Sequence, residues 1–123
     1  MDQPKKIMIA DDDAAILDSL SLMLEFEGYQ VSATLNGETV LSMAEKPDLL
    51  LLDIWMSGVD GRDICKKLKQ HEATRSLPVV LISASNDIQR SAIEAGADDF
   101  LAKPFEMNDL LEKIEKNLKN NYE

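Results

Sequence analysis

The stretch Pro47-Asp48-Leu49-Leu50-Leu51-Leu52-Asp53 places four consecutive leucines directly before a carboxylate. A short, continuous apolar run is typical of a strand that is buried on both faces of a parallel sheet. The carboxylate that ends the run would then lie at the carboxyl end of a central strand. In open α/β sheets this edge carries the functional crevice, so the stretch indicates both the fold and the place of a site.

Working outward, similar runs predict four more strands. With Leu49–Asp53, the expected strands are Lys6–Ala10, Gln30–Thr34, Pro78–Ser83 and Asp99–Ala102. Amphipathic stretches alternate with these runs, and the alternation is the signature of βα units. We therefore predict a single α/β domain over residues 1–123, with a doubly wound five-stranded parallel sheet, five helices and a frayed tail at residues 120–123.

The helices are predicted from apolar spacing and from capping residues. They are expected at about Ala14–Glu27, from Asn36 to Pro47, at Gly61–Gln70, from Asn86 to Gly96 and at Glu106–Lys119. Asn36 and Asn86 are the expected N-caps, and Gly28 ends the first helix. The side chains expected to face the sheet from the first two helices are Ile16, Leu20, Met23 and Leu24, then Val40, Leu41 and Ala44. The lysines expected to suit the negative end of the last helix are Lys113, Lys116 and Lys119.

The composition argues against several function classes. The 13 basic and 23 acidic side chains leave a net charge of −10, whereas nucleic-acid binding needs a basic surface. No apolar run approaches the roughly 18 residues of a membrane span. The run after Lys5 and Lys6 is shorter than the about 7–15 residues of a signal peptide. We expect a cytoplasmic protein that binds neither nucleic acid nor membrane, with the single Cys65 as a packed thiol.

Charged and hydroxyl side chains follow four of the five predicted strands. They are Asp11, Asp12 and Asp13 after the first strand, Asp53 after the third, Ser83 after the fourth and Lys103 after the fifth. Because the carboxyl ends of parallel strands meet at one edge, we expect these side chains to converge. Asp13, directly before the first helix, is interpreted as an N-cap rather than a ligand.

These side chains suit phosphoryl chemistry. Two carboxylates about 4 Å apart repel by roughly 4 kcal/mol at an effective dielectric constant near 20, so converging acids need a cation such as Mg²⁺ or Mn²⁺. Lys103 and Ser83 can bind further phosphoryl oxygens. Asp53 can attack phosphorus and form an acyl phosphate. The sequence therefore predicts a metal-assisted phosphoryl-accepting site.

The same residues resemble the receiver domain of two-component response regulators, of the chemotaxis-regulator type. The resemblance rests on five segments that together span nearly the whole chain. They are Ile7–Asp12, Pro47–Met56, Gly58 with Asp60-Gly61, Leu77–Ala84 and Gly96–Phe105. The resemblance implies the flavodoxin-like receiver fold, with strand order 2-1-3-4-5.

The resemblance also implies roles for individual residues. Asp53 would take a phosphoryl group from a sensor histidine kinase or a phosphotransfer protein, and Lys103 and Ser83 would bind its oxygens. The implied metal ligands are Asp12, Asp53 and the backbone carbonyl of Trp55, with Asp11 acting largely through water. A cis peptide before Pro104 would aim Lys103 inward.

Three further positions carry expectations about switching and rate. Ser83 and Phe100 would move together as the switch, although Phe100 lacks the hydroxyl of the tyrosine that is common there. We hypothesise that Trp55 hinders the attack of water and, with Ser85, sets the phosphoryl lifetime. Ser57 stands where the family often has proline, which would loosen that loop.

Three alternative functions fit the sequence less well. A haloacid-dehalogenase-like phosphatase needs a second acid where Trp55 stands, and a flavodoxin-like FMN module needs a phosphate loop where three acids stand. A receiver that only docks partners is disfavoured by the intact Asp12, Asp53, Ser83 and Lys103. Target binding is expected on the face of the fourth helix, fifth strand and fifth helix, in a monomer or weak dimer. The sequence leaves open the cognate kinase, the output, and whether the chain stands alone or belongs to a longer regulator.

Overall fold

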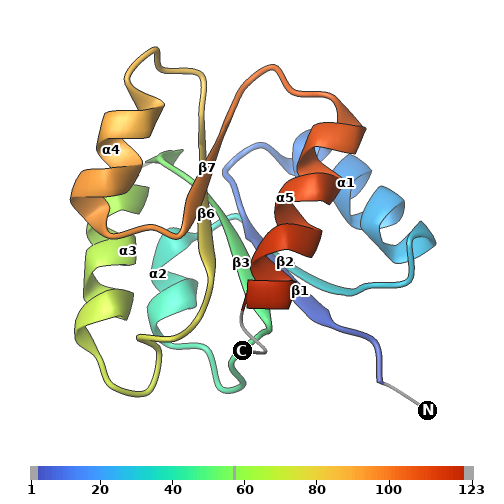
Figure 1. The fold of residues 1–123 in the computed structure, drawn as a ribbon, viewed down its shortest axis with the longest axis horizontal. Coiled ribbons are helices and arrows are strands. Elements are labelled where there is room, and N and C mark those ends of the chain that lie inside the picture. The colour runs from blue at the N-terminus through green and yellow to red at the C-terminus, as the bar shows by residue number, and fades with distance from the viewer. Residues whose placement is uncertain (1–2, 57, 121–123) are drawn as a thin grey trace.

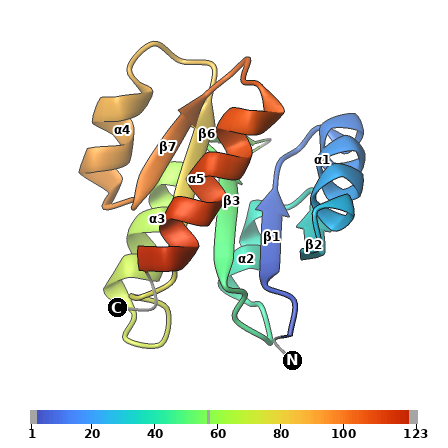
Figure 2. The ribbon, with the colours of Figure 1, turned by 45° about the vertical axis from the view of Figure 1, so that its right-hand side comes forward.

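The computed structural model describes residues 3–56 and 58–120. Within these residues a five-stranded parallel sheet has the order β2-β1-β3-β6-β7 (Figures 1 and 2). Its strands are β1 (Lys6–Ala10), β2 (Gln30–Thr34), β3 (Leu49–Asp53), β6 (Val79–Ser83) and β7 (Asp99–Ala102). The helices are α1 (Ala14–Phe26), α2 (Gly37–Leu41), α3 (Gly61–Gln70), α4 (Ile88–Ala95) and α5 (Met107–Asn120). The predicted fold class and strand order are confirmed.

Helices cover both faces of the sheet. Figures 1 and 2 show α1 and α5 on one face and α2, α3 and α4 on the other. The leucine run of β3 serves both cores, because successive side chains of a strand point to opposite faces. Leu49 and Leu51 pack in the core under α1 and α5, and Leu50 and Leu52 pack in the core under α2, α3 and α4. A strand at the centre of such a sheet has no solvent side, which explains why its sequence lacks polar alternation.

The strand register brings the predicted site residues to one edge. Ala10 of β1 pairs with Leu52 of β3, so Asp11 and Asp53 occupy the next position on neighbouring strands. Ser83 of β6 pairs with Ala102 of β7, so Lys103 follows directly beyond that pair. All of these residues lie at the carboxyl ends of the strands.

A small antiparallel hairpin follows β3 and was not predicted. It consists of β4 (Trp55–Met56) and β5 (Val59–Asp60), with Trp55 paired to Asp60. Strands of two residues are too short to produce a periodic pattern, so the sequence carried no signal for them. The hairpin returns the chain to Gly61, whose N–H donates to the carbonyl oxygen of Ile54 at 2.7 Å. The start of α3 is thereby held against the end of β3.

Two expectations about helix packing are wrong. In α1 the buried stripe is Leu17, Leu20 and Leu24, and Met23 is 45% exposed because it lies beside that stripe rather than on it. The second helix ends at Leu41 instead of continuing to Pro47. Leu41 and Ala44, which we expected to face the sheet with Val40, are both exposed, so the apolar stripe needed to support another turn is interrupted.

The ends of α4 and α5 also differ from expectation. The N-cap of α4 is Asp87 rather than Asn86, and its side chain makes no capping hydrogen bond. Gly96 ends α4 with φ 79°, as predicted. Helix α5 continues through Asn120, and residues 121–123 of the expected tail lie outside the described residues. Within the described ranges, every helix is too short or too polar to cross a bilayer.

Two glycines that begin helices give a matched test of backbone packing. A Cβ at Gly61 would lie 2.3 Å from the backbone oxygen of Asp53, whereas a Cβ at Gly37 would meet the flexible ends of Ile64 and Met56. We predict that Gly61→Ala lowers the free energy of unfolding by about 1–3 kcal/mol and that Gly37→Ala lowers it by less, because side-chain ends can move and the β3 backbone cannot. Urea denaturation measures both, and equal losses would contradict the close approach of α3 to β3.

Candidate functional site

Three carboxylates converge at the carboxyl edge of the sheet. One oxygen each from Asp11, Asp12 and Asp53 lies within 4.8 Å of the others. Asp11 and Asp53 are only 4% and 6% exposed, whereas Asp12 faces solvent. The Asp13 carboxylate instead accepts hydrogen bonds from Ala15 and Ile16 N–H groups, which confirms its interpretation as the N-cap of α1.

Lys103 supplies a positive charge to this cluster. Its Nζ donates to Asp11 Oδ2 at 3.1 Å and lies 3.6 Å from Asp53 Oδ1. The backbone N–H of Lys103 donates to the carbonyl oxygen of Ser83 at 2.9 Å. This hydrogen bond, at the end of the β6–β7 pair, fixes the position of the Lys103 backbone. The peptide between Lys103 and Pro104 is cis, as the resemblance implied.

Ser83 and Ser85 form the rim on the β6 side. Ser83 is 1% exposed and lies one position beyond Ile82, which pairs with Asp53. The Ser83 hydroxyl oxygen accepts the backbone N–H of Ser85 at 3.0 Å. The Ser85 hydroxyl in turn donates to the carboxylate of Asp87. The loop after β6 is therefore ordered by hydroxyl bonds that begin at the predicted phosphoryl-binding serine.

The surroundings of Asp53 disfavour ionisation of its carboxyl group. Burial raises the pKa of Asp53 to about 6, Asp11 and Asp12 raise it as well, and Lys103 partly opposes them. One ammonium group is thus not enough to offset burial and two neighbouring carboxylates. A further cation at this position would favour the ionised form of Asp53.

Trp55 follows Asp53 by two residues, on the hairpin strand β4, and is 57% exposed. Its ring lies under the guanidinium of Arg62, with 4.7 Å from Cζ to the ring centroid. This contact could not be predicted from the sequence, because the hairpin that brings the two side chains together has no periodic pattern. Ser57, whose loop we expected to be loosened, lies outside the described residues.

The predicted switch residue Phe100 contacts a polar cluster that the sequence analysis missed. Asp99, the first residue of β7, is 8% exposed and accepts hydrogen bonds from Lys113 Nζ at 2.8 Å and Asn117 Nδ2 at 3.1 Å. Lys116 Nζ lies 3.6 Å from the same carboxylate. The Lys113 ammonium also lies 5.0 Å from the centroid of the Phe100 ring. Lys113 and Lys116, which we expected to interact with the negative C-terminal end of α5, thus bind Asp99 of β7 instead.

The carboxylate of Asp99 is stabilised in its ionised form. Burial opposes ionisation, but hydrogen bonds from Lys113, the Phe100 N–H and Asn117 outweigh it and lower the pKa of Asp99. An acid at the start of a buried strand, with Lys113 and Asn117 one helical turn apart, is the signal that could have identified the cluster.

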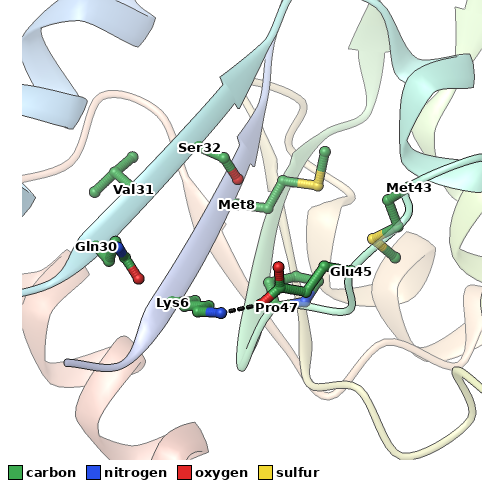
Figure 3. Close-up of a pocket in the computed structure, with 8 residues that line it drawn as sticks. All are labelled: Lys6, Met8, Gln30, Val31, Ser32, Met43, Glu45 and Pro47. Atoms are coloured by element: carbon green, nitrogen blue, oxygen red, sulfur yellow. Dashed lines mark hydrogen bonds and ion pairs between the residues drawn. The ribbon is translucent and has the colours of Figure 1, made fainter. Parts of the chain in front are cut away.

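A pocket at the opposite end of the sheet is separate from this site. Figure 3 shows it between β1, β2 and the segment before β3. Lys6 and Gln30, the first residues of their strands, line it, and Lys6 forms an ion pair with Glu45. The pocket therefore lies at the amino ends of the strands, away from the carboxylate cluster.

The fold and the site define the class. The acids follow β1 and β3, the strands at which the strand order of a doubly wound sheet reverses, and ligands of such sheets bind at this point. The model of the response regulator receiver domain matches residues 7–115. The chain therefore belongs to the response regulator receiver family of two-component signalling, whose members bind Mg²⁺ through an acidic pocket and partner with histidine kinases or phosphotransfer proteins.

Similar proteins agree with this assignment. The chain is 37% identical over 113 residues to the DNA-binding dual master transcriptional regulator RpaA of Synechocystis sp. and 42% identical over 105 residues to the response regulator PleD of Caulobacter vibrioides. These matches cover 89% and 82% of this chain but only 47% and 23% of the relatives. The chain thus spans half or less of their length.

Solved structures give the same result for the fold. A putative response regulator from Chloroflexus aurantiacus superposes with a TM-score of 0.88 at 37% identity, covering 94% of this chain and 98% of that one. A CheY-like receiver domain protein from Methanospirillum hungatei also gives 0.88, at 32% identity and 97% coverage of both chains.

The Asp99 cluster predicts a pH-dependent contribution to stability. We expect Asp99→Asn to lower the free energy of unfolding at pH 7 by about 1–3 kcal/mol, because the charge-assisted bonds to α5 are lost. Since folding lowers the pKa of Asp99, this contribution is present above the unfolded pKa, about 4, and disappears as the pH falls through the folded value.

Urea denaturation at pH 7 and pH 3 measures the difference. Glu94→Gln, at an exposed position of α4, is the matched control and should change stability little at either pH. A loss for Asp99→Asn that is equally large at pH 3 would contradict the ion-pair account.

Proposed function

We propose that residues 1–123 act as one phospho-accepting receiver domain in which Asp53 takes a phosphoryl group from a phosphohistidine of a sensor kinase or phosphotransfer protein. An Asp53 carboxylate oxygen attacks phosphorus, the phosphorus–nitrogen bond breaks, and its electron pair returns to the imidazole. The observation that carries the proposal is the convergence of Asp11, Asp12 and Asp53 on Lys103 at one edge of the sheet. The chain would then catalyse only its own phosphorylation and slow dephosphorylation, and it would not be an enzyme in the usual sense.

A divalent cation fits the donor set of this edge. Mg²⁺ or Mn²⁺ would be held by Asp12, Asp53 and the Trp55 carbonyl, with Asp11 contributing through water. Such an ion supplies charge neutralisation for the phosphoryl oxygens. The raised pKa of Asp53 supports the proposal, because burial and the neighbouring carboxylates of Asp11 and Asp12 disfavour the ionised form that a cation would stabilise. Lys103 and the Ser83 hydroxyl would bind the remaining phosphoryl oxygens, which Lys103 can reach from its place beside Asp53.

The proposed switch runs from Ser83 to Phe100. Both residues lie on neighbouring strands, since Leu81 pairs with Phe100 and Ser83 with Ala102. Phe100 is half-buried against the core and contacts the Lys113 ammonium, so an inward movement would change the surface formed by α4, β7 and α5. We infer that this surface binds the downstream protein target.

The cluster around Asp99 also supports the proposal of a monomer or weak dimer. Asp99 is saturated within its own chain by Lys113, Lys116 and Asn117, so these groups are not left to pair across an interface. We propose that the protein acts in the cytoplasm and that this chain binds neither nucleic acid nor membrane directly. Its charge of −10 disfavours nucleic acid as a direct partner.

Labelling of Asp53 tests the proposal directly. Intact-mass measurement after incubation with Mg²⁺ and acetyl phosphate should show one added phosphoryl group on the parent chain and none on Asp53→Asn, which lacks a nucleophilic carboxylate. Asp18→Asn, at an exposed position of α1, is the control and should be labelled like the parent.

Two results would contradict the proposal. Equal labelling of Asp53→Asn and the parent would place the phosphoryl group elsewhere. Failure of the parent to respond to both acetyl phosphate and beryllofluoride, with Trp55 fluorescence as the second readout, would favour a receiver that only docks partners.

A further inference from the structure

Arg62 contacts two residues of the β4–β5 hairpin that follows Asp53, namely Asp60 and Trp55. Its Nε lies 3.0 Å from Asp60 Oδ1 and its Nη2 lies 2.7 Å from Asp60 Oδ2, which is a bidentate ion pair. The same guanidinium lies 4.7 Å from the centroid of the Trp55 ring. A planar guanidinium can do both at once, because its edge donates hydrogen bonds while its face stacks on an aromatic ring.

The ion pair is built into the start of α3. Asp60 is the N-cap of that helix and accepts the backbone N–H of Arg62 at 2.9 Å. One carboxylate therefore binds both the backbone and the side chain of the same residue. This double attachment limits the rotamers of Arg62 more than a surface ion pair between distant residues would, because the helix start itself is fixed.

The same backbone leads to Asp53. Trp55 pairs with Asp60 across the β4–β5 hairpin, and Gly61 donates to the Ile54 carbonyl, one residue after Asp53. The ion pair and the indole are thus attached to the segment that holds the proposed phospho-acceptor. Loss of the Arg62 side chain would remove the contact with the Trp55 ring, whereas the backbone bond from Gly61 to Ile54 does not involve that side chain.

We propose that Arg62, held by Asp60, is a positioning residue that keeps the Trp55 indole at the rim of the site and thereby slows hydrolysis of the Asp53 acyl phosphate. The inference rests on the proposed function. In hydrolysis a water oxygen attacks phosphorus, the bond between phosphorus and the Asp53 oxygen breaks, the carboxylate leaves with the electron pair, and the attacking water loses a proton to solvent. An indole held in one place excludes water from this approach more steadily than one that rotates freely.

The decay of the phosphorylated protein measures this effect. After phosphorylation with acetyl phosphate and Mg²⁺ and removal of the donor, we expect Arg62→Gln to lose its phosphoryl group about two- to fivefold faster than the parent, the range that an exposed cation–π contact supports. Lys67→Gln, at an exposed position of the same helix, is the matched control and should decay like the parent.

A double-mutant cycle separates positioning from a general loss of structure. In a Trp55→Ala background, which should itself decay faster than the parent, Arg62→Gln is expected to have no further effect, because the group that it positions is gone. Trp55 is the single tryptophan of the chain, so acrylamide quenching reports on it alone. Quenching should be stronger in Arg62→Gln than in the parent, without any phosphorylation.

The outcomes distinguish the inference from the proposed function. Absence of label in the parent would overturn both. Label that decays equally fast in the parent and Arg62→Gln, or an equal acceleration by Arg62→Gln with and without Trp55, would overturn only the positioning role. Unchanged acrylamide quenching in Arg62→Gln would overturn it as well, since the indole would then not be held by the guanidinium.

Discussion

The structure depends on a concentration of negative charge at the ends of two central strands. Asp11 and Asp53 are buried side by side, Asp12 completes the group, and Lys103 is the cation that the described residues bring within ion-pair distance of both buried acids. A folded chain keeps such a group only where the surrounding structure is stable enough to offset the repulsion. The β3 leucines provide that stability, because they are fully buried in both cores.

The scaffold around the acids is built by close backbone contacts rather than by additional charges. Gly61 brings the start of α3 against the β3 backbone, and the hairpin between them carries Trp55. On the far side of the site, the β6–β7 register fixes where Lys103 begins. The start of α3, the β4–β5 hairpin and the β6–β7 pair come from different segments of the chain, so residues that are distant in the sequence meet beside the acids.

Features that follow from apolar patterns and sheet topology could be predicted from the sequence, whereas contacts that depend on individual rotamers could not. The five strands, their order and the edge on which Asp11, Asp53, Ser83 and Lys103 gather follow from apolar runs and from the resemblance, since a parallel sheet leaves few choices of topology. The cap of α4 and the side chains around Asp99 were missed, because they depend on which rotamers reach a neighbouring element. The contact of Arg62 with Trp55 depends on a two-residue hairpin that has no periodic signal.

The pKa of the Asp53 carboxyl group is the most direct measure of the central claim, and ¹³C NMR titration of the folded protein can determine it with and without Mg²⁺. The account predicts a pKa of about 6 for the metal-free protein, because burial and the two neighbouring acids disfavour the charged form, and a clear fall when Mg²⁺ is added. A pKa close to the ordinary value of about 4 that does not respond to Mg²⁺ would contradict it.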